Sequence, residues 1–186
     1  MTSFKDCIVT ISGLPGSGTS TVARLLSEKT DMEIVSTGEI FRSLAKENQL
    51  SLEEFGKIAE KDDEIDKKLD ARIVEEAEPG RILEARLSGY MLHRSNIKAY
   101  KVWLEADRET RINRIASREN ESFDKIRKKV IEREKSERKR YKEYYNIDLS
   151  DKSIYDMSID SQENLPEEIV DKIMEGLKDE ACAGEE

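Results

Sequence analysis

Short apolar runs alternate along the chain with longer segments whose apolar residues recur every three or four positions. The short runs predict buried β-strands, whereas the longer spacing predicts amphipathic helices. The predicted strands cover residues 8–11, 33–36, 82–83, 102–104 and 154–159. Strands that alternate with helices favour an α/β fold, in which a parallel sheet is covered on both faces. Because ligands of such sheets bind beyond the carboxyl ends of the strands, the residues that follow each strand are the first candidates for a site.

Capping residues mark several of the helix starts. Ser51 and Glu54 form a capping box, and Asp107 and Ser122 are expected to cap two later helices. The helix after Ser122 begins with apolar residues, up to Ile131, and continues with charged ones. We therefore expect this helix to leave the core partway along its length. The other helices are predicted over residues 21–26, 40–45, 65–77 and 169–177.

A glycine-rich loop, residues 13–20, lies between the first strand and the first helix and reads Gly-Leu-Pro-Gly-Ser-Gly-Thr-Ser. It fits the phosphate-binding pattern G-x-x-x-x-G-K-[ST] at both glycines and at Ser20, but Thr19 stands where the pattern has lysine. Backbone N–H groups of such loops converge on an anion at the positive end of a helix, and this does not require lysine. The loop predicts phosphate binding, with an ordinary glycine-rich turn as the alternative.

The composition narrows the class of protein. The chain has 186 residues, which is typical of one domain, and a net charge of -9, which argues against a general nucleic-acid binder. Basic residues nevertheless crowd between Arg111 and Lys142 and favour a local polyanion site. Cys7, Cys182 and the single histidine, His93, lack metal-type spacing, and no apolar run approaches a membrane span. We expect a cytoplasmic monomer without nucleic-acid or membrane partners.

Two segments resemble parts of nucleoside monophosphate kinases. Residues 36–42, which end in Arg42, look like the segment in which these enzymes hold the acceptor phosphate. Residues 113–118 contain Arg114 and Arg118 and resemble the paired-arginine helix that brackets ATP in adenylate kinases. The resemblance implies that both substrates of a phosphoryl transfer have a place on this chain.

Other features narrow the resemblance to cytidylate kinases. Arg133, Glu134, Glu137 and Arg140 match in spacing the lid segment of the bacterial enzymes. The lysine-free loop, the turn that begins at Arg86 and the Glu-Arg-Lys-Arg-Tyr-Lys-Glu-Tyr-Tyr block of residues 137–145 together resemble archaeal-type cytidylate kinases. The resemblance extends over nearly the whole chain.

This resemblance implies a P-loop kinase fold, with a five-stranded parallel sheet flanked by helices. It implies a single domain over residues 1–178. Within that domain, a helical region for the nucleoside monophosphate (NMP) would cover about residues 37–78, and a mobile lid about residues 119–148. The acidic residues 179–186 are expected to form a disordered tail.

The implied activity is ATP-dependent phosphoryl transfer to CMP or dCMP, with Mg2+ as cofactor. A kinase for AMP or another small acceptor is one alternative. Another is a degenerate P-loop protein that binds nucleotide without transferring phosphate, for which Thr19 is the best argument. The arginines of the lid and of the acceptor segment favour a kinase. Ala85 departs from the glycine that related kinases usually have before the arginine of this turn.

The resemblance assigns roles to individual residues. The expected ATP-binding residues are Gly13, Leu14, Pro15, Gly16, Ser17, Gly18, Thr19, Ser20, Thr21, Arg114 and Arg118. The expected NMP-binding residues are Ser36, Thr37, Gly38, Arg42, Arg86 and Glu137. We hypothesise that Arg133, Arg138 and Arg140 close over the phosphates as the catalytic cations. Ser20 is expected to bind Mg2+, with Glu84 either a water-mediated contributor or a helix-capping carboxylate.

Two acidic residues near the acceptor side are harder to interpret. Asp66 and Asp70 lie one helical turn apart and could contact the edge of a base. An exposed helix face is the interpretation that we favour for them. Tyr141, Tyr144 and Tyr145 are expected to pack the base of the lid on the core.

Overall fold

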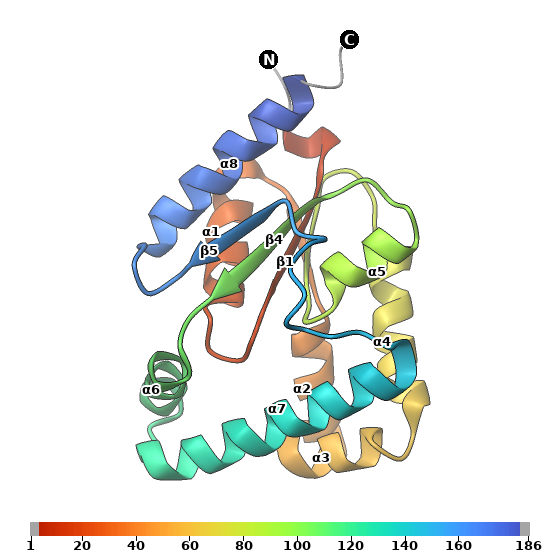
Figure 1. The fold of residues 1–186 in the computed structure, drawn as a ribbon, viewed down its shortest axis with the longest axis vertical. Helices are drawn as coiled ribbons and strands as arrows, with labels where there is room; N and C mark the ends of the chain where they lie inside the picture. Colours follow the sequence, from red (N-terminus) through yellow and green to blue (C-terminus); the bar gives the residue numbers. More distant parts are fainter. Residues whose placement is uncertain (1–3, 183–186) are drawn as a thin grey trace.

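A computed structural model describes residues 4–182 (Figure 1). It contains a five-stranded parallel sheet in the order β2-β3-β1-β4-β5. The strands are β1 (Ile8–Gly13), β2 (Glu33–Ser36), β3 (Arg81–Glu84), β4 (Tyr100–Glu105) and β5 (Met157–Asp160). The predicted α/β fold with a five-stranded parallel sheet is therefore confirmed. Because β1 lies at the centre, the glycine-rich loop leaves the middle of the carboxyl edge.

One face of the sheet is covered by α1 (Thr19–Thr30) and α8 (Pro166–Cys182). Val9 and Ile11 point to this face because side chains alternate along a strand, and they pack with Leu26 and Ile173 in one buried cluster. Burial of each large aliphatic side chain stabilises the fold by roughly 1.5–3 kcal/mol. A short 3-10 helix, η1 (Phe4–Asp6), precedes β1 on the same side.

The opposite face is covered by α4 (Asp63–Glu75) and α5 (Ser88–Arg94). Trp103 and Leu83 of the sheet form a second buried cluster with Ile73 and Leu92, as expected for a tryptophan within a strand. Helix α5 was missed in the sequence because its seven residues are too few to display a helical period.

The remaining helices lie beyond the carboxyl edge of the sheet (Figure 1). Helices α2 (Thr37–Glu47) and α3 (Leu52–Ala59) lead into α4, and α6 (Arg108–Glu119) leads into the long α7 (Phe123–Tyr145). The capping box of Ser51 and Glu54 is confirmed, and Asp107 accepts a hydrogen bond from the Thr110 amide at 2.7 Å. Ser122 occupies the N-cap of α7, but its side chain makes no cap hydrogen bond.

Two expectations about helices were wrong or incomplete. Helix α7 does not leave the core partway: after Ile126 and Val130, its inner face buries Glu134, Glu137 and Arg140. Figure 1 shows it crossing from α6 over α3. Helix α8 continues to Cys182, so the expected disordered tail is helical as far as that residue, and residues 183–186 lie outside the described part of the chain.

Candidate active site

The glycine-rich loop joins β1 to α1 and has the backbone of an anion-binding turn. Gly16 and Gly18 have φ angles of 85° and 96°, a region that favours glycine, and Gly18 is the N-cap of α1. The Ser17 amide donates to the carbonyl of Leu14 at 3.0 Å and closes the turn. The loop therefore directs the N-terminus of α1 toward the carboxyl edge, where a phosphate would be stabilised by the helix dipole.

Glu84, at the end of β3, connects this loop to the acceptor segment. Its Oε1 accepts hydrogen bonds from Thr19 at 2.6 Å and from Ser20 at 3.2 Å. Its Oε2 accepts from the hydroxyl of Ser36, which is also the N-cap of α2. Glu84 is thus not itself a helix cap. It holds three hydroxyls from two loops at one point, and Thr19, in the position of the usual lysine, takes part in this contact.

Arg42 and Gly38 lie at the start of α2, beside Glu84. A methyl group added at Gly38 would lie 3.5 Å from Nη1 of Arg42 and 4.0 Å from Oε2 of Glu84, so the guanidinium folds back toward the N-terminus of the helix. Within residues 4–182, Arg42 makes no ion pair. Its charge is therefore available to an anion, beside the N-terminal end of the α2 dipole.

Glu137 lies between two arginines of the expected site. Its carboxylate accepts from Nε of Arg86 and from Nε of Arg133, each at 2.9 Å. Burial alone would raise the pKa of Glu137, but the guanidinium groups of Arg86 and Arg133 outweigh it and lower the pKa to about 2. The carboxylate therefore stays charged at neutral pH and orients both cations.

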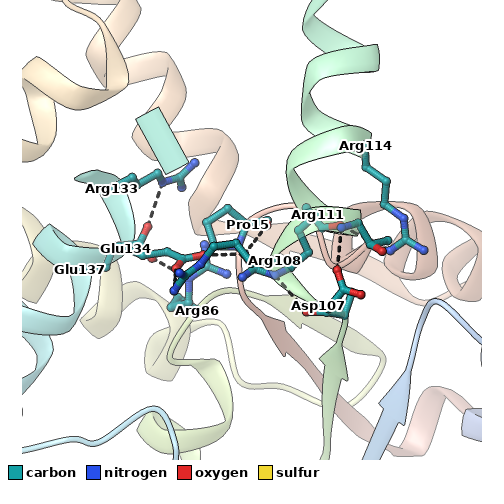
Figure 2. A network of polar contacts seen from close by, with 12 residues as sticks. Pro15, Arg86, Asp107, Arg108, Arg111, Arg114, Arg133, Glu134 and Glu137 are labelled. Atoms are coloured by element: carbon teal, nitrogen blue, oxygen red, sulfur yellow. Dashed lines mark hydrogen bonds and ion pairs between the residues drawn. The ribbon is translucent and has the colours of Figure 1, made fainter. Parts of the chain in front are cut away.

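A second buried ion pair connects α7, the helix that carries Glu137, to the glycine-rich loop (Figure 2). Arg111 of α6 lies 2.5 Å from Oε1 of Glu134 and donates to the carbonyl of Pro15 at 3.0 Å. Arg108 contacts Glu134 from the solvent side, at 3.5 Å. Arg111 carried no signal in the sequence beyond its place in a basic segment, and Glu134 none beyond its place in the lid spacing, because nothing local shows which charges will be buried.

A third buried ion pair joins α7 to α4. Nε of Arg140 is 2.7 Å from Oδ2 of Asp66, and Nη1 donates to the carbonyl of Gly56 at 3.1 Å. Asp66 is only 5% exposed, so its assignment to an exposed face was wrong. Tyr141 is buried beside this pair, and the Tyr144 hydroxyl donates to the carbonyl of Ala59 at 2.8 Å, in agreement with a packing role.

These elements enclose a cleft of about 290 Å³. The expected site residues that line it are Gly13, Leu14, Pro15, Gly16, Thr19, Ser20, Thr37, Gly38, Arg42, Glu84, Arg86, Arg118, Arg133, Glu137 and Arg140. Ser36 does not line the cleft; it is buried behind the lining residues and donates to Glu84. Arg138 instead lines a separate hollow on the other side of α7, next to Trp103 and Asp148, so its expected catalytic role has no support from this arrangement.

The outer side of the glycine-rich loop opens on a neighbouring hollow. Of the expected ATP-binding residues, those that line this hollow but not the cleft are Ser17, Gly18, Thr21 and Arg114, whereas Gly16, Thr19, Ser20 and Arg118 line both. Arg114 donates to the hydroxyl of Ser161 at 2.9 Å and to its carbonyl at 2.6 Å. The segment from Ser161 to Pro166, which supplies the far wall, was not predicted, since it carries no motif.

The oxygen ligands that Mg2+ prefers are present at the start of α1. The hydroxyl of Ser20 and the carboxylate of Glu84 lie within 3.2 Å of each other at the carboxyl edge. Within the described ranges no group of three or more acidic, histidine or cysteine residues is arranged so that it could hold a metal ion. Two oxygen donors suit an ion that keeps most of its waters and is held largely by substrate phosphates.

Comparison with known proteins gives the family. The cytidylate kinase-like family matches residues 8–163. The chain belongs to this family. It is 48% identical over 176 residues to a cytidylate kinase of Methanococcus maripaludis, a match that covers 92% of this chain and 99% of that protein. A cytidylate kinase of Methanocaldococcus jannaschii is 51% identical over 156 residues, which cover 83% of this chain and 88% of that one.

Solved structures support the fold of this family member. A shikimate kinase from Aquifex aeolicus has a TM-score of 0.56 at 20% identity and covers 95% of this chain and 99% of its own. A gluconokinase from Sinorhizobium meliloti has a TM-score of 0.62 at 15% identity, with coverage of 95% and 94%. The P-loop kinase fold is confirmed. Over the described part of the chain, no helix is both long and apolar enough to cross a membrane.

Replacement of Glu137 by Gln tests the buried cluster on α7. The pKa of Glu137 is lowered from 4.5 to about 2 by folding, so its charge stabilises the fold above about pH 4.5, and this contribution is lost as the pH falls toward 2. We expect the variant to lose about 3 kcal/mol of unfolding free energy at pH 7. The difference from wild type should shrink as the pH is lowered from 5 to 3, measured by urea unfolding. Glu132→Gln, on the exposed side of the same helix, is the control and should change little. A difference that stays constant over this pH range would contradict the interpretation.

Replacement of Gly16 by Ala tests the packing of the loop. An added Cβ would lie 2.6 Å from the carbonyl oxygen of Arg111, and the φ of 85° is unfavourable for alanine. Gly80→Ala is the matched control, because its φ of 85° imposes the same backbone strain, its Cβ would lie 3.4 Å from the nearest atom, the carbonyl oxygen of Lys5, and it lies away from the glycine-rich loop. We expect both variants to lose about 1–2 kcal/mol of stability, and Gly16→Ala alone to displace the loop and raise the KM for ATP by about tenfold or more. Equal KM values in the two variants would show that the contact with Arg111 does not position the loop.

Proposed function

We propose that this chain transfers the γ-phosphoryl group of ATP to the phosphate of CMP, and also of dCMP, in the cleft described above. Membership of the cytidylate kinase-like family, with about half of the residues identical to archaeal cytidylate kinases, makes it a nucleoside monophosphate kinase. The observation that carries the proposal is that one cleft joins the glycine-rich loop to Arg42, Arg86 and Arg133. An anion-binding loop faces a set of cations across a space of substrate size.

Each substrate would occupy one side of the loop. The phosphates of ATP would lie on the backbone amides of residues 13–20, and its base in the hollow between Arg118 and the segment from Ser161 to Pro166. The acceptor phosphate would lie between Arg42 and Arg86, at the N-terminus of α2. In this arrangement the attacking oxygen of CMP would face the end of the ATP phosphates.

The transfer requires positive charge more than a base. The attacking oxygen is already anionic, and the transition state spreads its charge over the oxygens of the moving group. Arg133 is the candidate catalytic cation, because it lines the cleft, remains 27% exposed and is oriented by Glu137. Arg140 is deeply buried and paired with Asp66, so we propose that it mainly positions the acceptor helices against α7.

Ser20 and Glu84 are the residues that would hold Mg2+. When bound with ATP, the ion would neutralise charge on the phosphates. Thr19 and Ser36 would keep Glu84 oriented toward this position through their hydroxyl groups. Because every group in the cleft comes from one chain, a monomer would suffice for the reaction. We further propose that it takes place in the cytoplasm.

The substrate assignment is tested by diphosphate formation from ATP and Mg2+, with CMP, dCMP, UMP, AMP and GMP offered separately. We expect CMP to give the highest kcat/KM, dCMP to be accepted, and the two purine nucleotides to react at least about a hundredfold more weakly. Omission of Mg2+ should abolish product. A higher kcat/KM with AMP than with CMP would overturn the assignment.

The role of Arg133 is tested by its replacement with Ala. Loss of one oriented cation at the phosphates is expected to lower kcat by about a hundredfold or more. Arg138→Ala should have a much smaller effect because Arg138 faces another hollow, and Arg127→Ala, on the exposed face of α7, should behave as wild type. Steady-state kinetics would measure all three. A larger loss for Arg138→Ala than for Arg133→Ala would restore Arg138 as the catalytic cation.

A further inference from the structure

Helix α4 presents two carboxylates to the acceptor side of the cleft. Asp66 and Asp70 are separated by one helical turn, and both line the cleft together with Phe41, Leu52 and Leu69. The three apolar side chains offer surface on which the faces of a planar base could pack. The acidic pair therefore lies where a base bound in this part of the cleft would present its edge.

The protein's own groups do not fully satisfy these two carboxylates. Asp66 shares a single guanidinium, that of Arg140, with the neighbouring backbone carbonyl of Gly56. The Tyr145 hydroxyl faces Asp70 and partly offsets its burial. Oδ2 of Asp70 is buried, and this hydroxyl is its hydrogen-bonding neighbour. A carboxylate can accept several hydrogen bonds, so a single donor for each aspartate leaves acceptor capacity of both groups unused.

The electrostatics of the pair lead to the same conclusion. Burial raises the pKa of Asp66 to about 6 and that of Asp70 to about 7, and the Arg140 guanidinium only partly opposes this. Two carboxylates thus face one cation in a poorly solvated wall. A ligand that brings N–H donors to this wall would supply the hydrogen bonds that the pair lacks.

We propose that Asp66 and Asp70 accept hydrogen bonds from the exocyclic amino group of the cytosine base, and so select CMP over UMP. This inference rests on the proposed function, which places the nucleoside monophosphate in this part of the cleft. Cytosine carries at C4 an amino group with two N–H donors. Uracil carries a carbonyl oxygen there, and at about pH 8, where both aspartates are largely ionised, this oxygen would lie against the carboxylate oxygens without a proton between them. The pair thus favours the amino base and disfavours the oxo base.

The test is the ratio of kcat/KM for CMP to that for UMP in Asp66→Asn and Asp70→Asn. An asparagine amide can donate to the uracil carbonyl, so each substitution should lower kcat/KM for CMP and raise kcat/KM for UMP. We expect the ratio to fall by about tenfold or more in each variant. Asp70→Asn is the cleaner variant because Asp70 is not the ion-pair partner of Arg140. Loss of packing alone would lower both rates and leave the ratio unchanged. An unchanged ratio in both variants would overturn the inference.

Two further measurements complete the test. Glu64→Gln changes an exposed acid on the same helix that forms an ion pair with Lys68, and its ratio should equal that of wild type. Wild-type enzyme should bind CMP dimethylated at the exocyclic nitrogen about tenfold or more weakly than CMP, since that base has no amino proton to donate. This second measurement needs no variant to fold, and equal binding of the two nucleotides would overturn the inference.

The outcomes also separate this inference from the proposed function. An enzyme that phosphorylates CMP but shows unchanged ratios in the variants would leave the kinase assignment in place and remove only the role of the aspartates. Failure of the wild-type enzyme to phosphorylate any nucleoside monophosphate would remove both.

Discussion

The site depends on ion pairs buried along the inner face of helix α7. Where the helix runs out of apolar residues, Glu134, Glu137 and Arg140 continue its buried face. A buried charge that loses its partner destabilises a protein by about 3–5 kcal/mol, whereas a complete pair is tolerated. The position of α7 is therefore fixed by the places in the fold where matching charges occur.

The partners of these charges lie on the elements that form the cleft, namely α6, the turn after β3 and α4. Arg111 connects Glu134 to the carbonyl of Pro15, in the glycine-rich loop. Arg86, directly after β3, pairs with Glu137, and Asp66 brings α4 to Arg140. One helix thus joins the side of the cleft at the glycine-rich loop to the side formed by α2, α3 and α4. The glycine-rich loop lacks its usual lysine, but these arginines lie around it. Each of these arginines is held in place by a buried ion pair.

The sequence was sufficient for the features that depend on near neighbours. Strand positions follow from apolar runs, the cap at Ser51 from a four-residue pattern, and the phosphate loop from spaced glycines. The buried half of α7 could not be predicted, because a run of charges looks solvent-exposed until its partners are known. The burial of Asp66 was missed for the same reason, since Arg140 lies far along the chain and Gly56 offers only its backbone. Pairing between distant charges is a property of the folded chain.

The use of charge to hold α7 also affects how the site responds to temperature. Hydration of ions carries a strongly negative entropy, so water competes less well for buried charges as temperature rises. Apolar contacts gain no comparable advantage on heating. The desolvation penalty of the pairs Arg111 with Glu134 and Arg86 with Glu137 should therefore fall as temperature rises. The aliphatic clusters around the sheet gain no such stabilisation. On warming, the geometry of the cleft should therefore be preserved better than the packing of the core beneath it.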